Sequence, residues 1–172
     1  AQIGEMLGWF DLLPNSLIHA RPLLYLYQAR TLAFDTPFKH RDKVNQILVH
    51  VQHMLTTEEY GNDIADTVAG HIASLRGLFS SPPLQPDHDP DKVLALFQEA
   101  LRLLPPDEAR LRSDIYNSIA YEYMHLEDTD SALRACQTAY SEARIANNSI
   151  SALIALRNQA VIAYYQGDLP RA

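Results

Sequence analysis

Residues 129–147, TDSALRACQTAYSEARIAN, carry the clearest structural signal in the chain. Asp128 or Thr129 can cap the beginning of a helix here, and Asn147-Asn148 can adopt the left-handed backbone conformation that ends one. The small and apolar residues between these ends recur at spacings of three and four, as on one face of an α-helix: Ala132, Leu133, Cys136, Ala139, Tyr140 and Ala143. The stretch therefore predicts an amphipathic helix with defined ends.

The segments on either side are also predicted to be helical. Residues 107–126 place apolar side chains from Leu111 to Tyr123 on one face, so this segment is expected to form an antiparallel hairpin with 129–147. Residues 149–166 carry two apolar rows, one with Leu153 and Leu156 and the other with Ile150, Ile154, Val161 and Tyr165. A helix that is apolar on two sides packs on two sides, as each helix does in a solenoid.

Similar residues recur about every forty positions. Ala120 and Tyr123 of one predicted helix correspond to Ala160 and Ala163, and Gly167 lies in the turn that follows. We expect an all-α fold, a right-handed α-solenoid of antiparallel helix pairs that repeat about every 40 residues, as a single domain over 1–172. Its expected parts are a lead-in at 1–21, helix pairs at about 22–55, 57–104 and 107–147, and a half pair at 149–172.

Two segments depart from this pattern. Residues 80–90, SSPPLQPDHDP, contain four prolines, which predicts an extended surface loop within the second pair, either a spacer or a recognition edge. At the other end, Gly167, Asp168 and Pro170 have the character of a turn and the first residues of a further helix. We expect a repeat to be cut there. The row Ile150, Ile154, Val161 and Tyr165 then lacks part of its cover and is available for a homodimer.

Composition limits the classes of function. Of the 172 residues, 47% are hydrophobic and 20% are charged, so the chain has enough apolar side chain for a core and is not disordered. The net charge of -7, with Lys and Arg scattered singly, argues against nucleic acid as a partner of this segment. No apolar run is long enough for a membrane span. A single cysteine, Cys136, and the lack of a leader sequence lead us to expect a cytoplasmic protein.

Helix pairs of this kind resemble tetratricopeptide repeats, although the usual repeat has about 34 residues. The resemblance is carried by Phe97 to Pro105, by Ile119 to Ala139, and by Ala160 with Gly167-Asp168. With the longer spacing and the segments 12–14, 21–24, 70–76 and 103–113, the order of motifs is similar to the central region of MalT-like, ATP-dependent LuxR-family transcriptional regulators of the STAND class. The loop at 82–90 departs from that family's pattern, which implies a different partner there.

The resemblance implies a sensor domain. In that family an ATPase precedes the repeats and a LuxR-type helix-turn-helix follows them, but this chain has no G-x-x-x-x-G-K-[ST] loop and no basic recognition helix. ATP and DNA are therefore expected to bind other domains of the whole regulator, with no cofactor in this segment. We expect a non-catalytic domain that binds a small-molecule inducer or a regulatory protein in a concave groove. The alternative is a constitutive scaffold that binds a peptide or helix of another protein.

The residues that invite a catalytic or metal-binding role have simpler interpretations. His50 and His53 have helical spacing, but two exposed histidines are expected because no third ligand is near in sequence. Asp87-His88-Asp89 predicts a polar turn in the proline-rich loop. Cys136 lies in an apolar stripe, which predicts a small buried hydrophobe with a raised thiol pKa. The chain also lacks a Gly-x-Ser-x-Gly motif and a recognisable acid/base couple, so we expect neither an enzyme nor a metal site.

The candidate binding residues come from the first helix of each pair. In tetratricopeptide-like arrays these helices line the concave surface, and positions near the small crossing residues point into the groove. This rule selects seven residues: Arg30, Thr67, His71, Asn117, Tyr121, Arg157 and Tyr164. Guanidinium, amide and aromatic groups in one groove can orient a polar ligand and stack on its apolar part. Asn117 and Arg157, forty residues apart, are the leading pair.

Overall fold

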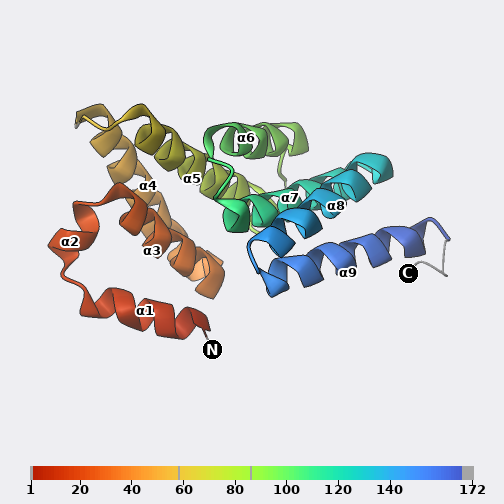
Figure 1. Ribbon diagram of the computed structural model, residues 1–172, viewed down its shortest axis with the longest axis horizontal. Helices are drawn as coiled ribbons and strands as arrows, with labels where there is room; N and C mark the ends of the chain where they lie inside the picture. The colour runs from red at the N-terminus through yellow and green to blue at the C-terminus, as the bar shows by residue number, and fades with distance from the viewer. Residues whose placement is uncertain (1, 58, 86, 168–172) are drawn as a thin grey trace.

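The computed structural model describes residues 2–57, 59–85 and 87–167. These residues form nine α-helices and no strand, which confirms the all-α prediction. The helices are α1 (Gln2–Leu12), α2 (Asn15–His19), α3 (Pro22–Asp35), α4 (Pro37–Thr57), α5 (Asn62–Ser80), α6 (Pro90–Leu103), α7 (Ala109–His125), α8 (Thr129–Ile145) and α9 (Ser149–Tyr165). They follow one another across the molecule from α1 to α9 (Figure 1). The further helix expected from Asp168 onward lies outside the described residues.

The last three helices have the same length and spacing. Each has 17 residues, and they begin at residues 109, 129 and 149. The side chains of Asp128 and Asn148 cap α8 and α9 by accepting a backbone N–H three residues on. After α7, α8 and α9 the chain turns through the left-handed region, at Glu127 (φ 58°), Asn147 (φ 50°) and Gly167 (φ 75°). The helix ends predicted around 129–147 are thereby confirmed.

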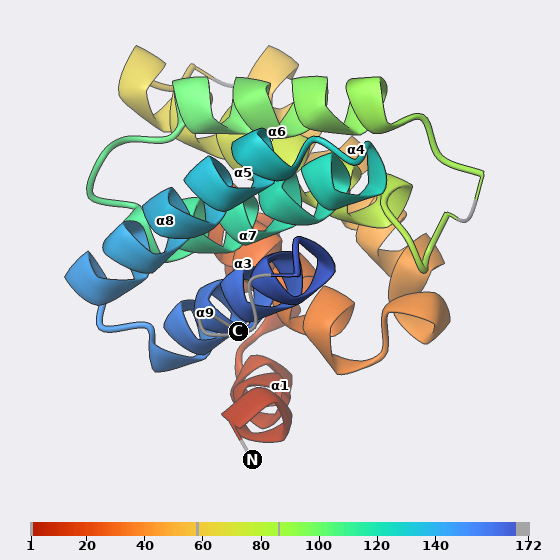
Figure 2. The same ribbon diagram turned by 90° about the vertical axis from the view of Figure 1, so that its right-hand side faces the viewer.

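Most helices pack against their neighbours along the chain. From α2 onward, each helix contacts the next one, and the alternate helices α3 and α5, and α7 and α9, also touch. Helix α1 instead packs on α3, and Figure 2 shows it at the opposite side of the molecule from α6. The alternate helices α3, α5, α7 and α9 all contribute side chains to one cleft.

Two clusters of buried apolar side chains form the core. One extends from Leu26 to Leu84 and joins α3, α4 and α5, whereas the other extends from Ala73 to Ile162 and joins α5 to α9. Helix α5 contributes to both clusters. Ala120 and Ala132 are fully buried in the second cluster, where their small side chains allow α7 and α8 to approach closely. None of the described helices is long and apolar enough to cross a bilayer.

The crossing of α5 and α6 depends on two glycines. A Cβ atom on Gly77 would lie 2.6 Å from the Phe97 ring, and one on Gly70 would lie 2.8 Å from Leu104 Cγ. Any larger residue at either position therefore collides with a buried side chain. The sequence analysis did not single out these two glycines as crossing residues.

The proline-rich segment between α5 and α6 is anchored to the rest of the molecule. Leu84 is buried, and the Arg41 guanidinium of α4 donates hydrogen bonds to the carbonyl oxygens of Leu84 (3.2 Å) and Phe79 (3.4 Å). His88 reaches in the other direction, to Glu122 of α7. The segment is a loop, as predicted, but its apolar and imidazole side chains are packed against two helices.

Candidate functional site

A cleft of about 250 Å³, which we call the inner cleft, opens between α3, α5, α7 and α9. Four of the seven predicted binding residues line it, one from α3, two from α7 and one from α9: Arg30, Asn117, Tyr121 and Arg157. Its walls also include Phe34, Ile154 and the start of the proline-rich loop at Ser81 and Pro82. The structure therefore brings Asn117 and Arg157 into one site and makes the loop part of its edge.

Asn117 has a fixed orientation in this cleft. Its Nδ2 donates to the Ser151 carbonyl oxygen (3.0 Å) and to Ser151 Oγ (2.7 Å) on α9. Because a backbone carbonyl only accepts hydrogen bonds, the NH₂ group must face Ser151. Asn117 Oδ1 is buried and has no hydrogen-bond partner among the described residues. Asn117 thus offers a hydrogen-bond acceptor of known identity.

Glu122 is a second acceptor that the sequence analysis missed. It is fully buried, its Oε2 lies 2.8 Å from His88 Nε2, and its Oε1 has no hydrogen-bond partner among the described residues. A signal was present, because Glu122 continues the buried series Leu111, Ile115 and Ile119 at helical spacing. The prediction of a polar turn did not anticipate that the His88 side chain is only 8% exposed and pairs with this carboxyl group.

Arg30 lies beside two carboxylates. Its Nη2 donates to Ser74 Oγ on α5, while its Nε is buried and without a partner among the described residues. Burial lowers the pKa of the guanidinium, and the nearby Asp114 and Glu108 oppose that change, so Arg30 stays charged. Burial raises the pKa of Asp114, and Arg30 opposes that change. Arg30 and Asp114 line the inner cleft and also a second cleft.

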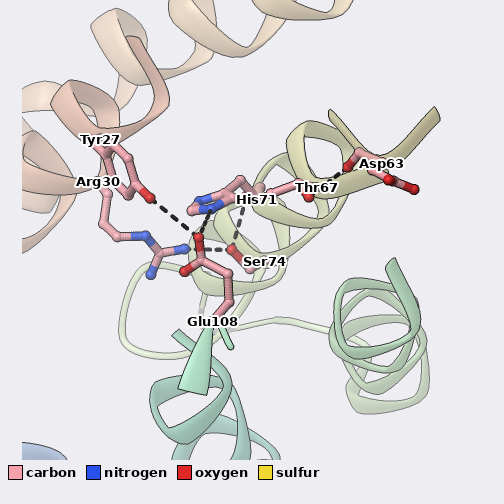
Figure 3. A network of polar contacts seen from close by, with 7 residues as sticks. All are labelled: Tyr27, Arg30, Asp63, Thr67, His71, Ser74 and Glu108. Carbon is pink, nitrogen blue, oxygen red and sulfur yellow. Dashed lines mark hydrogen bonds and ion pairs between the residues drawn. The ribbon is translucent and has the colours of Figure 1, made fainter. Parts of the chain in front are cut away.

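The second cleft, which we call the outer cleft, lies between α1, α3, α5 and the beginning of α7, and its volume is about 550 Å³. Figure 3 shows its polar floor, where Tyr27 and His71 converge on Glu108. The Tyr27 hydroxyl donates to Glu108 Oε1 (3.3 Å), and His71 Nε2 lies 3.8 Å from the same oxygen. Trp9 and Met6 of α1 are exposed at its rim.

The charges on this floor follow from burial and proximity. His71 is 1% exposed, and burial lowers its pKa, so the imidazole is neutral at pH 7. His71 and the Tyr27 hydroxyl lower the pKa of Glu108, which is therefore ionised. Both ring nitrogens of His71 lack a hydrogen bond within the described part of the chain, since 3.8 Å exceeds hydrogen-bond length.

Two predicted binding residues lie outside both clefts. Thr67 Oγ1 donates to the Asp63 carbonyl oxygen of its own helix (2.7 Å), and Figure 3 shows it apart from the Glu108 contacts. Tyr164 is 63% exposed beside Tyr165 near the end of α9. Their register along the helix places them away from the cleft, which α5 lines with Ser74 and Leu78 and α9 lines with residues 154–158.

The other reactive side chains are structural or exposed. Cys136 is fully buried, and burial raises its pKa to about 11, which confirms the prediction of a small hydrophobe. His53 is exposed, as is His50, whose ring packs near Tyr25 and His19. Within the described ranges, no three His, Cys, Asp or Glu residues are grouped as metal ligands.

Comparison of the chain with protein-family models, with curated proteins and with solved structures gives no match. Function therefore has to be inferred from the two clefts and the side chains that line them.

Proposed function

We propose that this chain is a non-catalytic sensor domain that binds a small polar ligand in the inner cleft. In this proposal its helix pairs form a right-handed, tetratricopeptide-like solenoid in the cytoplasm. The domain belongs to a MalT-like, LuxR-type transcriptional regulator whose ATP-binding and DNA-binding domains are separate. The resemblance in the sequence supports the family, and the inner cleft supports the sensor role.

One observation carries the sensor role. Three buried polar atoms of residues that line a single cleft, Arg30 Nε, Asn117 Oδ1 and Glu122 Oε1, have no hydrogen-bond partner in the described structure. A buried polar atom without a partner costs about 1–3 kcal/mol, and native proteins retain few of them. A ligand that satisfies all three gains affinity at each contact, so this set is typical of a binding site.

The position of the cleft suggests how binding becomes a signal. Its lining residues come from α3, α5, α7 and α9, which belong to successive helix pairs. A ligand held by all four helices favours one relative arrangement of the pairs over others. In a stack with near-neighbour contacts, that preference changes the curvature of the array, and we propose that the ATPase responds to it.

A scaffold for another protein is the second candidate function. The outer cleft favours it, because it is larger than the inner cleft and its rim exposes Trp9 and Met6. Exposed aromatic side chains beside polar groups are common in protein interfaces. This function needs no ligand in the inner cleft.

A thermal-shift screen of sugars, amino acids and peptides distinguishes the two. A small ligand is expected to raise the melting temperature of the wild-type chain, because it binds only the folded state. Asn117→Ala and Arg157→Ala are expected to remove most of that increase, and Arg102→Ala, an exposed arginine of α6 outside both clefts, is expected to retain it. Stabilisation that survives both cleft variants, or that comes only from peptides, contradicts the proposed site.

A further inference from the structure

We infer that the ligand of the inner cleft is a small zwitterion of the amino-acid type, with its ammonium group held by Asn117 and Glu122 and its carboxylate held by Arg157. This inference rests on the proposed function, and it adds the chemical class of the ligand.

Two oxygen atoms of residues that line the inner cleft lack a hydrogen-bond donor in the described structure. Asn117 Oδ1 is an acceptor because Ser151 fixes the amide orientation, and Glu122 Oε1 belongs to a fully buried carboxyl group. Both residues are on α7, and both line the cleft. A ligand that presents only acceptors would leave these two oxygens unsatisfied. An ammonium group supplies three donors at one point.

Glu122 favours a cationic donor over a hydroxyl group. The carboxyl group has one partner, His88, at Oε2, and this contact fixes its orientation. A buried carboxylate is costly unless it is paired and both oxygens are hydrogen-bonded. A charge-assisted hydrogen bond from an ammonium group is about twice as strong as one from a neutral hydroxyl group. The site therefore selects an amine over a neutral polyol.

Arginine side chains supply the opposite charge. Arg157 lines the cleft with an exposed guanidinium group that makes no ion pair or hydrogen bond to any described residue. The fork of a guanidinium group matches both oxygens of a carboxylate. Arg30 adds a second guanidinium, whose Nε has no partner within the described ranges. An anionic group on the ligand gives Arg157 the partner that it lacks.

The remaining walls limit the size and shape of the ligand. The volume of about 250 Å³ is below the range of roughly 300–1,000 Å³ that is usual for drug-sized ligands, which favours a small ligand. Phe34, Tyr121 and Ile154 provide partly exposed apolar surface in the same cleft. An amino acid with an apolar or aromatic side chain fits this combination.

The test begins with calorimetric titration of the wild-type chain with the free L-amino acids. For the tightest binder, we then titrate the analogue without the amine and the analogue without the carboxylate, with glucose as the neutral polyol. Each removed charge is expected to weaken binding at least about tenfold, because hydrogen bonds to charged groups contribute that much. Glu122→Gln and Arg157→Gln are expected to lose comparable affinity, and the control Arg102→Gln none.

The failures of the two proposals are distinguishable. If glucose, or the analogue without the amine, binds as tightly as the amino acid, the zwitterion inference is wrong and the sensor function stands. If no free amino acid and no sugar binds at millimolar concentration, both are wrong. The analogue series uses only wild-type protein, so its result does not depend on whether Glu122→Gln folds. Because Arg157 is exposed, we expect Arg157→Gln to fold, and circular dichroism checks that it does.

Discussion

At the scale of single residues, Asn117 and Glu122 each have one polar atom that stabilises the fold and one oxygen atom that we assign to the ligand. One polar atom of each holds a neighbouring element, α9 through Ser151 and the proline-rich loop through His88. The other oxygen of each has no hydrogen-bond partner in the described part of the chain. These hydrogen bonds fix the two side chains before a ligand binds, so binding loses little of their conformational entropy.

His71 provides a prediction about pH. Its folded-state pKa is below the ordinary value of 6.5, so the unfolded chain binds a proton more readily than the folded chain. The stability from neutral His71 is complete above about pH 6.5 and declines as pH falls toward the folded pKa. Between pH 7.5 and 5.5 we expect the wild type to lose up to about 1.4 kcal/mol more than His71→Gln.

Urea unfolding of both proteins at the two pH values measures this difference. His53→Gln, which replaces an exposed histidine, is the control and is expected to follow the wild type. Equal losses in the wild type and in His71→Gln would show that the buried imidazole binds its proton as readily as an unfolded one.

The sequence allowed part of the site to be predicted. Asn117 and Arg157 were selected because they are forty residues apart. They occupy the same position in α7 and α9, which begin at residues 109 and 149, and both line the inner cleft. The contact between Glu122 and His88 could not be predicted from sequence, since the two residues are 34 positions apart and His88 lies in a loop. Contacts between a loop and a distant helix leave no periodic signal.

At the scale of elements, helix ends follow local chemistry. Asp128, Asn148 and the left-handed residues after each helix set the ends of α7, α8 and α9, so these bounds were predicted within about two residues. The short helix α2 was not predicted, because five residues carry too few repeats of a pattern. Its Ile18 is fully buried, which anchors the lead-in.

The crossing of α5 and α6 gives a prediction about packing. Gly77→Ala places a methyl group against the buried Phe97 ring, and we expect the free energy of unfolding to fall by about 1–3 kcal/mol. Gly8→Ala in α1 is the matched control, because nothing lies within 4 Å of a Cβ at that position. There the higher helix propensity of alanine is expected to raise stability by up to about 1 kcal/mol.

Chemical denaturation of the two variants tests this directly. Combining Gly77→Ala with Phe97→Leu is expected to cost less than the sum of the single changes, because the smaller side chain relieves the collision. Equal stability of Gly77→Ala and the wild type would mean that α5 and α6 separate without penalty.

At the scale of the whole molecule, one apolar surface is left uncovered. On α9, Ile150 is 65% exposed and Tyr165 80%, as expected for the row left without cover. Leu153 of the other apolar row is also 68% exposed, so that row is not covered as expected, although α9 packs on α7 and α8. We predict that the isolated domain forms a homodimer through this surface at high concentration, because apolar patches of this kind associate.

Light scattering across a range of concentrations checks the dimer. Leu153→Glu is expected to shift the protein to monomer, while Val49→Glu, a similarly exposed apolar residue on α4, is expected to leave association unchanged. A monomer at every concentration in the wild type would contradict this prediction.

The inner cleft is also a property of the whole molecule, because its lining residues come from helices far apart in sequence, from α3, which begins at residue 22, to α9, which begins at residue 149. Hydrogen exchange with and without the amino acid that stabilises the protein most is the most direct measurement of its role. We predict that the ligand slows exchange in the turns of α3, α5, α7 and α9 that carry the lining residues, and leaves α4 and α8 unchanged. Protection confined to α4, α6 or α8, or no protection by any small ligand, would contradict a binding site between the first helices of the pairs.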